Sequence, residues 1–307
     1  MPESYDVIIL GAGPAGLTAG LYCAQARLRV LAVERLTLGG RIMDIERVEN
    51  YPGFSDGISG AELGGEILTQ AMNYGMEIQL AEAEAVERRD GLIELTTSEG
   101  RYHGRSLIIA GGARPKKLNV AGEEELAGRG VGYCALCEGG QFTDKAIAVV
   151  GGGDAGIADA LYLSKIAKKI TVVEILPGLP AMPLLTDRVR QTSNIETICN
   201  ARITRITGDK MVDGASLTSN KTNETRTLAV EGILVRIGWE PETDYLGTTV
   251  PLDERGFVVV DDSMETGVPG VFAAGDIRSN SPMQISTAVG DGTVAALSVQ
   301  KYLREVR

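Results

Sequence analysis

The stretch that decides the fold is Asp6-Val-Ile-Ile-Leu-Gly-Ala-Gly-Pro-Ala-Gly16. Asp6 and the four apolar residues that follow it are typical of a short buried parallel strand. The glycines after it have the spacing G-x-G-x-x-G, and a helical segment reaches to about Arg27. A second strand, residues 28–33, then ends at the acidic residue Glu34. Strand, glycine turn, helix, strand and acid in this order predict a dinucleotide-binding βαβ unit.

The same pattern recurs in the second half of the chain. An apolar strand at 146–150 leads into Gly151-Gly-Gly-Asp-Ala-Gly156, a helix is expected to about Lys168, and a strand at 170–173 ends at Glu174. The first glycine and the acid are 23 positions apart in both copies. One glycine motif could be a strand–helix turn without a ligand, but two copies with matching offsets predict two dinucleotide sites. Each would hold a pyrophosphate at the N-terminus of its helix.

The elements after each copy predict how the domains are ordered along the chain. Each half continues into a strand followed by Gly-x-x-Pro, at 107–115 and at 233–241. A further apolar strand at 271–276 has no counterpart in the second half, so we assign it to the first domain. We therefore expect an α/β protein with two Rossmann-like, three-layer ββα dinucleotide-binding domains. Residues 1–117 and 246–307 would form the first domain, with the second domain, 118–245, inserted into it.

Two cysteines lie between the glycine motifs, in Cys134-Ala-Leu-Cys137. This spacing is found in redox-active disulfides and in half-sites for zinc. The chain has 4 cysteines and 1 histidine in all, and no second pair could complete a tetrahedral zinc site. We therefore expect no metal, and a disulfide that exchanges electrons with a bound cofactor.

Composition and charge exclude several classes of function. The net charge of -11 argues against nucleic-acid binding, which needs a basic surface. The uncharged run at 7–24 is interrupted by glycines and a proline and has no basic segment before it, so we expect neither a signal peptide nor a membrane span. The expected location is the cytoplasm.

Taken together, these motifs resemble the low-molecular-weight thioredoxin reductases, FAD-dependent enzymes of the pyridine nucleotide-disulfide oxidoreductase class. The resemblance covers almost the whole chain. The segments that carry it, besides the two glycine motifs, are Glu49-Asn-Tyr-Pro-Gly53, Gly132-Tyr-Cys-Ala-Leu-Cys137, Phe272-Ala-Ala-Gly-Asp276, Gln284 and Gly290-Asp-Gly292.

The resemblance implies two sets of cofactor-binding residues. The FAD set comprises Gly11, Gly13, Pro14, Ala15, Glu34, Gly39, Gly40, Arg41, Asn50, Ala83, Gly275, Asp276, Gln284 and Ile285. The pyridine nucleotide set comprises Gly151, Gly153, Asp154, Ala155, Gly156, Glu174 and Gly238.

The resemblance also implies catalytic roles for the cysteine segment. Cys137 would face the flavin and Cys134 would attack the disulfide of a thioredoxin or a thioredoxin-like protein. Glu138, where the family usually has Asp, would supply and remove protons during exchange. The alternative interpretation of Glu138 is a solvated carboxylate at a helix start, favoured by the helix dipole. The family further suggests a homodimer.

The expected electron donor departs from the family pattern. The family carries His-Arg-Arg after the second strand of the nucleotide domain, where this chain has Glu174-Ile175-Leu176. A carboxylate there favours the free 2′-hydroxyl of NADH over the 2′-phosphate of NADPH. Three alternatives stay open: an FAD-dependent dithiol oxidase that uses oxygen, a reductase supplied by ferredoxin or another non-nicotinamide donor, and a non-catalytic redox sensor.

Overall fold

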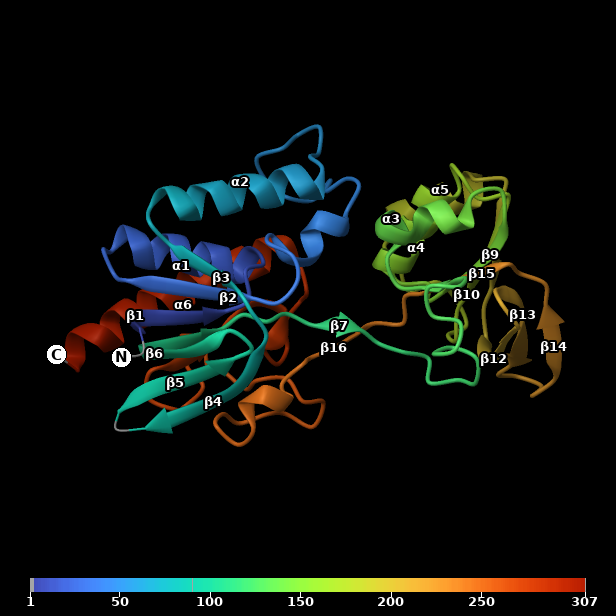
Figure 1. Cartoon of the computed structure of the whole chain (residues 1–307). Helices are drawn as coiled ribbons and strands as arrows, with labels where there is room; N and C mark the ends of the chain where they lie inside the picture. The colour runs from blue at the N-terminus through green and yellow to red at the C-terminus, as the bar shows by residue number, and fades with distance from the viewer. Residues whose placement is uncertain (1–2, 90, 307) are drawn as a thin grey trace. The chain divides into compact units, whose positions relative to one another are not determined.

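The computed structural model describes residues 3–89 and 91–306, and the chain divides into two compact units (Figure 1). The first unit combines residues 1–114 with 240–307, and the second consists of residues 115–239. The chain thus leaves the first unit once and returns to it. The two crossing segments pair with each other as short strands, β7 (Arg114–Pro115) and β16 (Trp239–Glu240). The crossings lie a few residues before the expected boundaries at 117/118 and 245/246.

The first unit contains one mixed sheet of seven strands. Its order is β3-β2-β1-β6-β5-β4, and β17 pairs with the end of β6. Pairing is parallel among β3, β2, β1, β6 and β17, and antiparallel in the β4-β5-β6 meander. The elements are β1 (Glu3–Leu10), α1 (Pro14–Gln25), β2 (Val30–Glu34), η1 (Gly40–Asp44), α2 (Gly60–Asn73), β3 (Glu77–Leu80), β4 (Ala83–Arg89), β5 (Leu92–Thr97), β6 (Gly100–Ile109), η3 (Asp244–Leu246), β17 (Val271–Ala273), η4 (Gly275–Ile277) and α6 (Ile285–Glu305).

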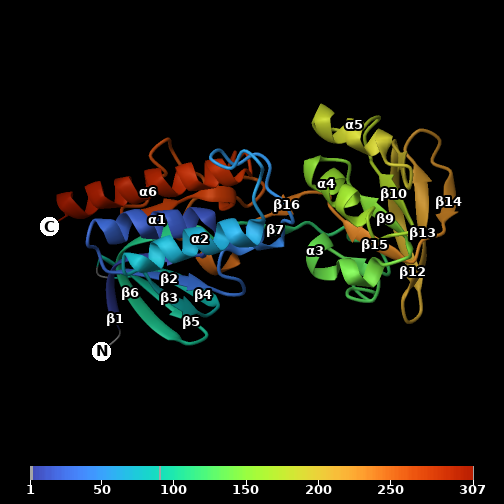
Figure 2. The ribbon, with the colours of Figure 1, turned by 90° about the horizontal axis from the view of Figure 1, so that it is seen from above.

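The alternation of side chains along β1 produces two cores, one on each face of this sheet. Val7 and Ile9 pack with α1 and α6 on the helical face. Ile8 and Leu10 face the opposite side and pack with the β4–β5 meander. Because both faces of the sheet are covered, residues 7–10 of β1 are continuously apolar and do not alternate with polar residues. Seen from above, α1, α2 and α6 form one layer over the strands (Figure 2).

The second unit repeats this architecture. A parallel sheet with the order β11-β10-β9-β15-β8 has helices on one face and the antiparallel β12-β13-β14 meander on the other. The elements are β8 (Val131–Gly132), α3 (Ala135–Glu138), η2 (Gly139–Phe142), β9 (Ala146–Val150), α4 (Asp154–Leu163), β10 (Lys169–Val173), α5 (Pro183–Gln191), β11 (Ile195–Ile198), β12 (Ala201–Gly208), β13 (Val212–Ser219), β14 (Thr225–Leu228) and β15 (Gly232–Val235).

These two units confirm the predicted fold class, with local differences at the helix ends. Both glycine-motif helices are shorter than expected, because α1 ends at Gln25 and α4 at Leu163. Arg27 adopts a left-handed φ of 61°, which cannot continue a helix. After α4, the Ser164 hydroxyl donates to the Leu161 carbonyl at 2.8 Å and competes with the helical backbone. Over residues 3–89 and 91–306, no helix combines the length and the apolar character needed to cross a membrane.

The packing of α6 on α1 depends on a residue without a side chain. A Cβ atom at Gly292, in the middle of α6, would lie 2.2 Å from the Ala15 carbonyl oxygen. Two positions earlier in the same helix, a Cβ at Gly290 would meet no atom within 4 Å. The two glycines therefore provide a matched pair for measuring this close approach.

We predict that Gly292→Ala lowers the free energy of unfolding by about 1–3 kcal/mol, because the added methyl group forces α1 and α6 apart. Gly290→Ala should be neutral or raise it by up to about 1 kcal/mol, because alanine favours helix and the position is open. Denaturant titration of the FAD-saturated variants measures both. Equal destabilisation by the two substitutions would contradict the packing argument.

Candidate functional site

The first glycine turn joins β1 to α1 and brings the backbone of the helix close to the strand. Gly11 has a φ of 104°, and a Cβ on it would lie 2.3 Å from the Ala110 carbonyl oxygen. A Cβ on Gly16 would lie 2.0 Å from the Gly11 carbonyl oxygen. The helix begins at Pro14 after Gly13, and no side chain caps this end. The first N–H groups of α1 therefore face a turn that is open to an anionic ligand.

Glu34, at the end of β2, is bonded to this turn through its carboxylate. Its Oε2 accepts a hydrogen bond from the Ala12 amide at 2.9 Å, and its Oε1 accepts one from the Leu36 amide at 2.9 Å. The strand order brings this about, because β2 lies beside β1 in register and both strands end at the same edge. Ala12 was not among the predicted site residues, although it lies inside the quoted motif.

Several predicted FAD residues that are distant in sequence come together at the same edge. Arg41, in η1, forms an ion pair with Asp276, in η4, and Ser281 donates to Asp276 at 3.3 Å. A Cβ on Gly40 would lie 2.8 Å from the Gly13 Cα, and one on Gly275 would lie 2.8 Å from the Ala15 Cβ. Gly39 donates from its amide to the Ala12 carbonyl at 2.9 Å.

A second group lies at the start of α6. The Asn50 amide nitrogen donates to the Gln284 side-chain oxygen at 3.1 Å. Gln284 is the N-cap residue of α6, and Ile285 is the first residue of that helix. Ala83 begins β4, two residues beyond Ala81, whose amide donates to the Glu34 carbonyl at 2.9 Å.

A buried ion pair that no sequence pattern predicts holds the η4 turn. Asp291, 7% exposed, accepts two bonds from the Arg278 guanidinium, at 2.6 and 3.1 Å, and one from the Gly275 amide at 3.1 Å. Asp291 belongs to the Gly290-Asp-Gly292 segment, which carried the resemblance but had no assigned role. Only the fold shows that it fixes Gly275 beside the first helix.

The residues of this edge fit a dinucleotide such as FAD. The turn at Gly11 has no room for a side chain, the start of α1 is uncapped, and Glu34 is held beside the turn. These are the features that a pyrophosphate and an adjoining ribose require. Gly11, Gly13, Ala15 and Glu34 would hold the adenosine diphosphate half.

The second glycine turn has the same construction. Gly151 has a φ of 116°, and a Cβ on Gly156 would lie 2.0 Å from the Gly151 carbonyl oxygen. Glu174, at the end of β10, accepts a hydrogen bond from the Gly152 amide at 2.6 Å and one from the Leu176 amide at 2.9 Å. Glu174 therefore occupies the position that Glu34 has in the first unit.

The loop after β10 folds back onto this turn. The Asp154 carboxylate accepts from the Met182 amide at 2.7 Å, and the Ala181 amide donates to the Gly152 carbonyl at 3.2 Å. The remaining predicted residues of this set are Gly153, which is the N-cap of α4, Ala155 in its first turn, and Gly238, which has a φ of 110° after β15. The sequence prediction missed that Asp154 bonds the loop after β10 to the start of α4.

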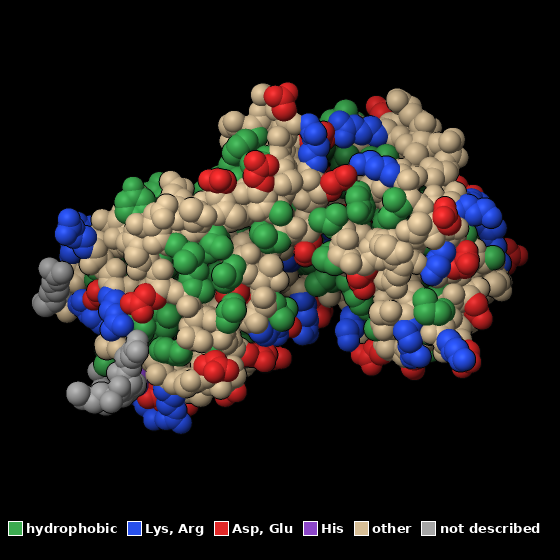
Figure 3. All heavy atoms as spheres, turned by 45° about the horizontal axis from the view of Figure 1, so that its top comes forward, with side chains coloured by type: hydrophobic (Ala, Val, Ile, Leu, Met, Phe, Trp, Pro, Cys, Tyr) green, Lys and Arg blue, Asp and Glu red, His purple; other side chains and the backbone are tan. Residues whose placement is uncertain are grey.

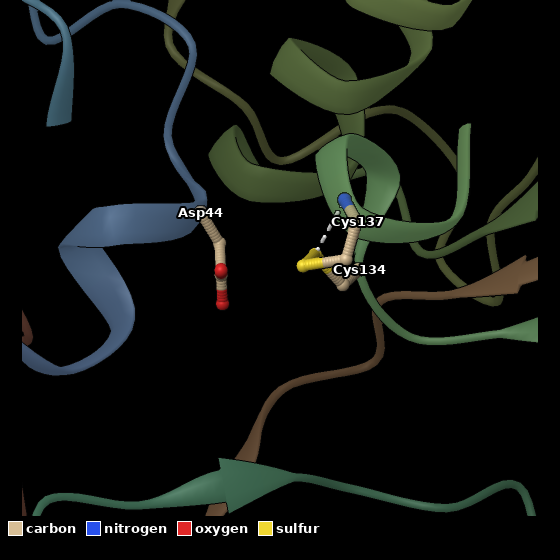
Figure 4. A group of neighbouring side chains, drawn as sticks. All are labelled: Asp44, Cys134 and Cys137. Atoms are coloured by element: carbon tan, nitrogen blue, oxygen red, sulfur yellow. Dashed lines mark hydrogen bonds between the residues drawn. A yellow bond between two sulfur atoms is a disulfide. The ribbon is translucent and has the colours of Figure 1, made fainter. Parts of the chain in front are cut away.

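Cys134 and Cys137 are joined by a disulfide, with their Cα atoms 5.4 Å apart (Figure 4). Cys134 is the N-cap of the one-turn helix α3, and its sulfur accepts a hydrogen bond from the Cys137 amide at 3.0 Å. Cys137 is exposed. The pair can therefore form the two-electron redox couple that the spacing predicts.

Glu138 bonds the backbone of the segment that carries the disulfide. Its Oε2 accepts hydrogen bonds from the amides of Tyr133, at 2.7 Å, and of Cys134, at 2.9 Å. The carboxylate is partly buried and bonded to the backbone, unlike the solvated carboxylate of the alternative interpretation. Its proton-transfer role remains a prediction.

The other two cysteines lie apart from this chemistry. Cys23 lies on the buried face of α1, where burial raises the pKa of its thiol to about 12. Cys199 follows β11, and partial burial together with the nearby Glu174 carboxylate raises the pKa of its thiol. Neither thiol has the lowered pKa of a reactive cysteine.

Comparison with known proteins gives full-length matches. The pyridine nucleotide-disulphide oxidoreductase family matches residues 5–292. Thioredoxin reductase of Listeria monocytogenes is 41% identical over 304 residues, which cover 99% of this chain and 95% of that protein. The bifunctional thioredoxin reductase/thioredoxin of Mycobacterium leprae is 38% identical, over 98% of this chain and 66% of that protein. The crystal structure of Lactococcus lactis thioredoxin reductase (FR conformation) is 35% identical, with a TM-score of 0.96 over 98% of this chain and 99% of that one.

Two glycine turns with their bonded acids, and a disulfide encoded between them, agree with these matches over the whole chain. The family implies FAD and a nicotinamide dinucleotide as cofactors. The chain therefore belongs to the low-molecular-weight thioredoxin reductase family, and it is a flavoprotein disulfide reductase.

Proposed function

We propose that this protein passes electrons from NADH, through FAD, to the Cys134–Cys137 disulfide and on to a thioredoxin-like protein. The observation that carries the choice of donor is Glu174. It is 5% exposed and accepts hydrogen bonds from the amides of Gly152 and Leu176, so it is held in place at the end of β10. In this type of fold, an acid at that position bonds the adenosine ribose hydroxyls of NAD.

The charge of the neighbouring loop supports the same donor. From Glu174 to Asp187 the sequence contains no lysine or arginine. Ile175 and Leu176, where the family has arginines, are 58% and 47% exposed. Arg190, further along in α5, bonds Asp187 at 3.0 Å. A 2′-phosphate would thus meet a fixed carboxylate beside a loop that carries no cation of its own.

The chain's own residues define the exchange step. Bound FAD supplies the transfer of an electron pair from the nicotinamide to the disulfide. With two protons, that pair converts the disulfide to two thiols. The Cys134 thiolate then attacks the partner's disulfide and forms a mixed disulfide, and Cys137 displaces the partner as a dithiol. Both backbone bonds to Glu138 end on Oε2, which leaves Oε1 as the oxygen that would carry a proton.

A thioredoxin-like partner is supported by the relatives. The Mycobacterium leprae protein, whose name joins the two activities, is matched by this chain over 66% of its length. Leu136 and Cys137 are both exposed beside the buried Ala135, so one edge of the redox turn is accessible to a protein disulfide.

We predict that Cys134→Ser and Cys137→Ser each lower the rate of disulfide reduction by roughly three orders of magnitude or more, because each removes one sulfur of the couple. The bound flavin should still bleach when NADH is added, since that step precedes the disulfide. Cys199→Ser, in the same unit, serves as the control and should retain full activity. Retention of thioredoxin reduction by either of the first two variants would contradict the assignment.

For the donor, we predict a kcat/KM for NADH at least about tenfold above that for NADPH, equivalent to about 1.4 kcal/mol. The double variant Ile175→Arg/Leu176→Arg should raise kcat/KM for NADPH by about tenfold, because both positions are exposed and add cations beside the 2′ position. The double variant Met72→Arg/Met211→Arg, at exposed positions on α2 and in the turn between β12 and β13, controls for the same change in net charge.

Anaerobic stopped-flow measurements separate this proposal from the alternatives. Equal or faster bleaching of the flavin by NADPH would contradict the preference for NADH. Bleaching by reduced ferredoxin alone would indicate a different donor, and bleaching by dithiols alone would indicate a dithiol oxidase. A flavin that is reduced but turns over neither disulfides nor dithiols would indicate a redox sensor.

We further propose that the protein is a homodimer. Apolar side chains gather over the helices of the first unit (Figure 3). Tyr22 on α1 and Val294 and Leu297 on α6 are 36%, 36% and 51% exposed. Multi-angle light scattering at micromolar concentration should give twice the chain mass of 32.5 kDa. A monomer at that concentration would contradict the proposal.

A further inference from the structure

We propose that Arg236 is a positioning residue for the redox turn. Together with Glu138, it holds the peptide bond between Tyr133 and Cys134 from both ends. This inference builds on the proposed function, because it concerns the same disulfide, but it does not depend on the identity of the electron donor.

The peptide bond before Cys134 lies between two opposite charges. Its carbonyl oxygen, on Tyr133, accepts a hydrogen bond from the Arg236 guanidinium Nη1 at 3.0 Å. Its N–H, on Cys134, donates to the Glu138 carboxylate Oε2 at 2.9 Å. The two groups belong to one rigid plane, so a rotation of the peptide would break both bonds. The cation and the anion also lie at the matching ends of the peptide dipole, where each is most favourable.

Arg236 is itself fixed by three different elements. It directly follows β15, and its amide donates to the Val150 carbonyl at 2.7 Å. Its Nε lies 2.5 Å from Asp159 Oδ2 on α4, and the two side chains are 16% and 17% exposed. Its guanidinium carbon lies 5.3 Å from the centre of the Trp239 ring. A side chain held in this way can act as a fixed support rather than as a mobile surface cation.

The backbone of Arg236 also belongs to the second nucleotide turn. A Cβ on Gly151 would lie 2.0 Å from the Arg236 carbonyl oxygen. The first glycine of that turn therefore packs directly against the backbone of Arg236. One residue thus contacts the turn that would bind the nicotinamide dinucleotide and, through its side chain, the turn that carries the disulfide. Arg236 connects the two sites within the second unit.

A third hydrogen bond holds Tyr133, through its side chain. Its hydroxyl donates to Glu123 at 2.8 Å, and Glu123, 1% exposed, also accepts from the amides of Leu118 and Asn119 at 2.8 and 2.6 Å. Burial and the bond to Glu123 raise the pKa of Tyr133, so its hydroxyl stays a donor. Tyr133 is therefore held at its amide, its carbonyl and its hydroxyl, and the arginine supplies the carbonyl bond.

This arrangement matters for the reduced form of the couple. In the disulfide, the Cys134 sulfur accepts a hydrogen bond from the Cys137 amide. The same bond would be charge-assisted to a Cys134 thiolate, so a turn that keeps this geometry favours the reduced form. The positive charge of Arg236, which is bonded to the peptide that precedes Cys134, also favours a thiolate at Cys134, whereas the Glu138 carboxylate opposes it. Loss of Arg236 should therefore destabilise the dithiol relative to the disulfide.

The test is the redox equilibrium of the Cys134–Cys137 couple in glutathione buffers. It uses anaerobic FAD-loaded protein without nucleotide, with alkylated peptides quantified by mass spectrometry. We expect Arg236→Met to shift the equilibrium at least threefold toward the disulfide. Arg236→Lys should be intermediate, because an ammonium keeps the charge but not the planar fork. Arg202→Met, an exposed arginine on β12 that bonds Asn220, is the control and should match the wild type within twofold.

The result also separates a positioning role from a merely structural one. An equilibrium within twofold of the wild type in Arg236→Met would overturn the proposal, whatever the change in melting temperature. If Arg236→Met does not fold, Arg236→Gln takes its place with the same expected direction. Failure of NADH to reduce the flavin would count against the proposed donor alone, since this equilibrium is measured without a nucleotide.

Discussion

The close packing of a helix onto the turn from which it starts is the constraint on which both units depend. In the first unit a Cβ on Gly16 would lie 2.0 Å from the Gly11 carbonyl, and in the second a Cβ on Gly156 would lie 2.0 Å from the Gly151 carbonyl. Only glycine permits this approach. Since the helix then begins directly at the end of the strand, its free N–H groups face the edge of the sheet where neighbouring strands also end.

The acids at the ends of β2 and β10 complete this arrangement. Glu34 and Glu174 each accept a bond from the amide that follows the first glycine, Ala12 in one unit and Gly152 in the other. In each unit the carboxylate thus stabilises the turn by a hydrogen bond and places a negative charge where a ribose would lie. In the second unit no lysine or arginine lies between Glu174 and Asp187, and the NADH preference proposed above rests on this combination.

The redox turn is built differently, because its helix is a single turn and cannot position the disulfide by itself. The backbone before Cys134 is held by Glu138, Arg236 and, through Tyr133, Glu123. These side chains come from the turn itself, from the end of β15 and from the segment near the crossing into the second unit. The disulfide therefore has its environment determined by residues up to about 100 positions away in sequence.

The sequence by itself determined the fold class, the two glycine turns, their acids and the cysteine pair, because each is a local pattern whose residue types and spacing have a direct physical reason. Pairs such as Arg41 with Asp276, Asn50 with Gln284 and Arg278 with Asp291 were decided only by the tertiary structure. So was the place of Arg236, which in the sequence is a lone cation after an apolar strand. Sequence patterns cannot show which buried charges meet, since that depends on how strands distant in the chain are ordered in the sheet and where their ends converge.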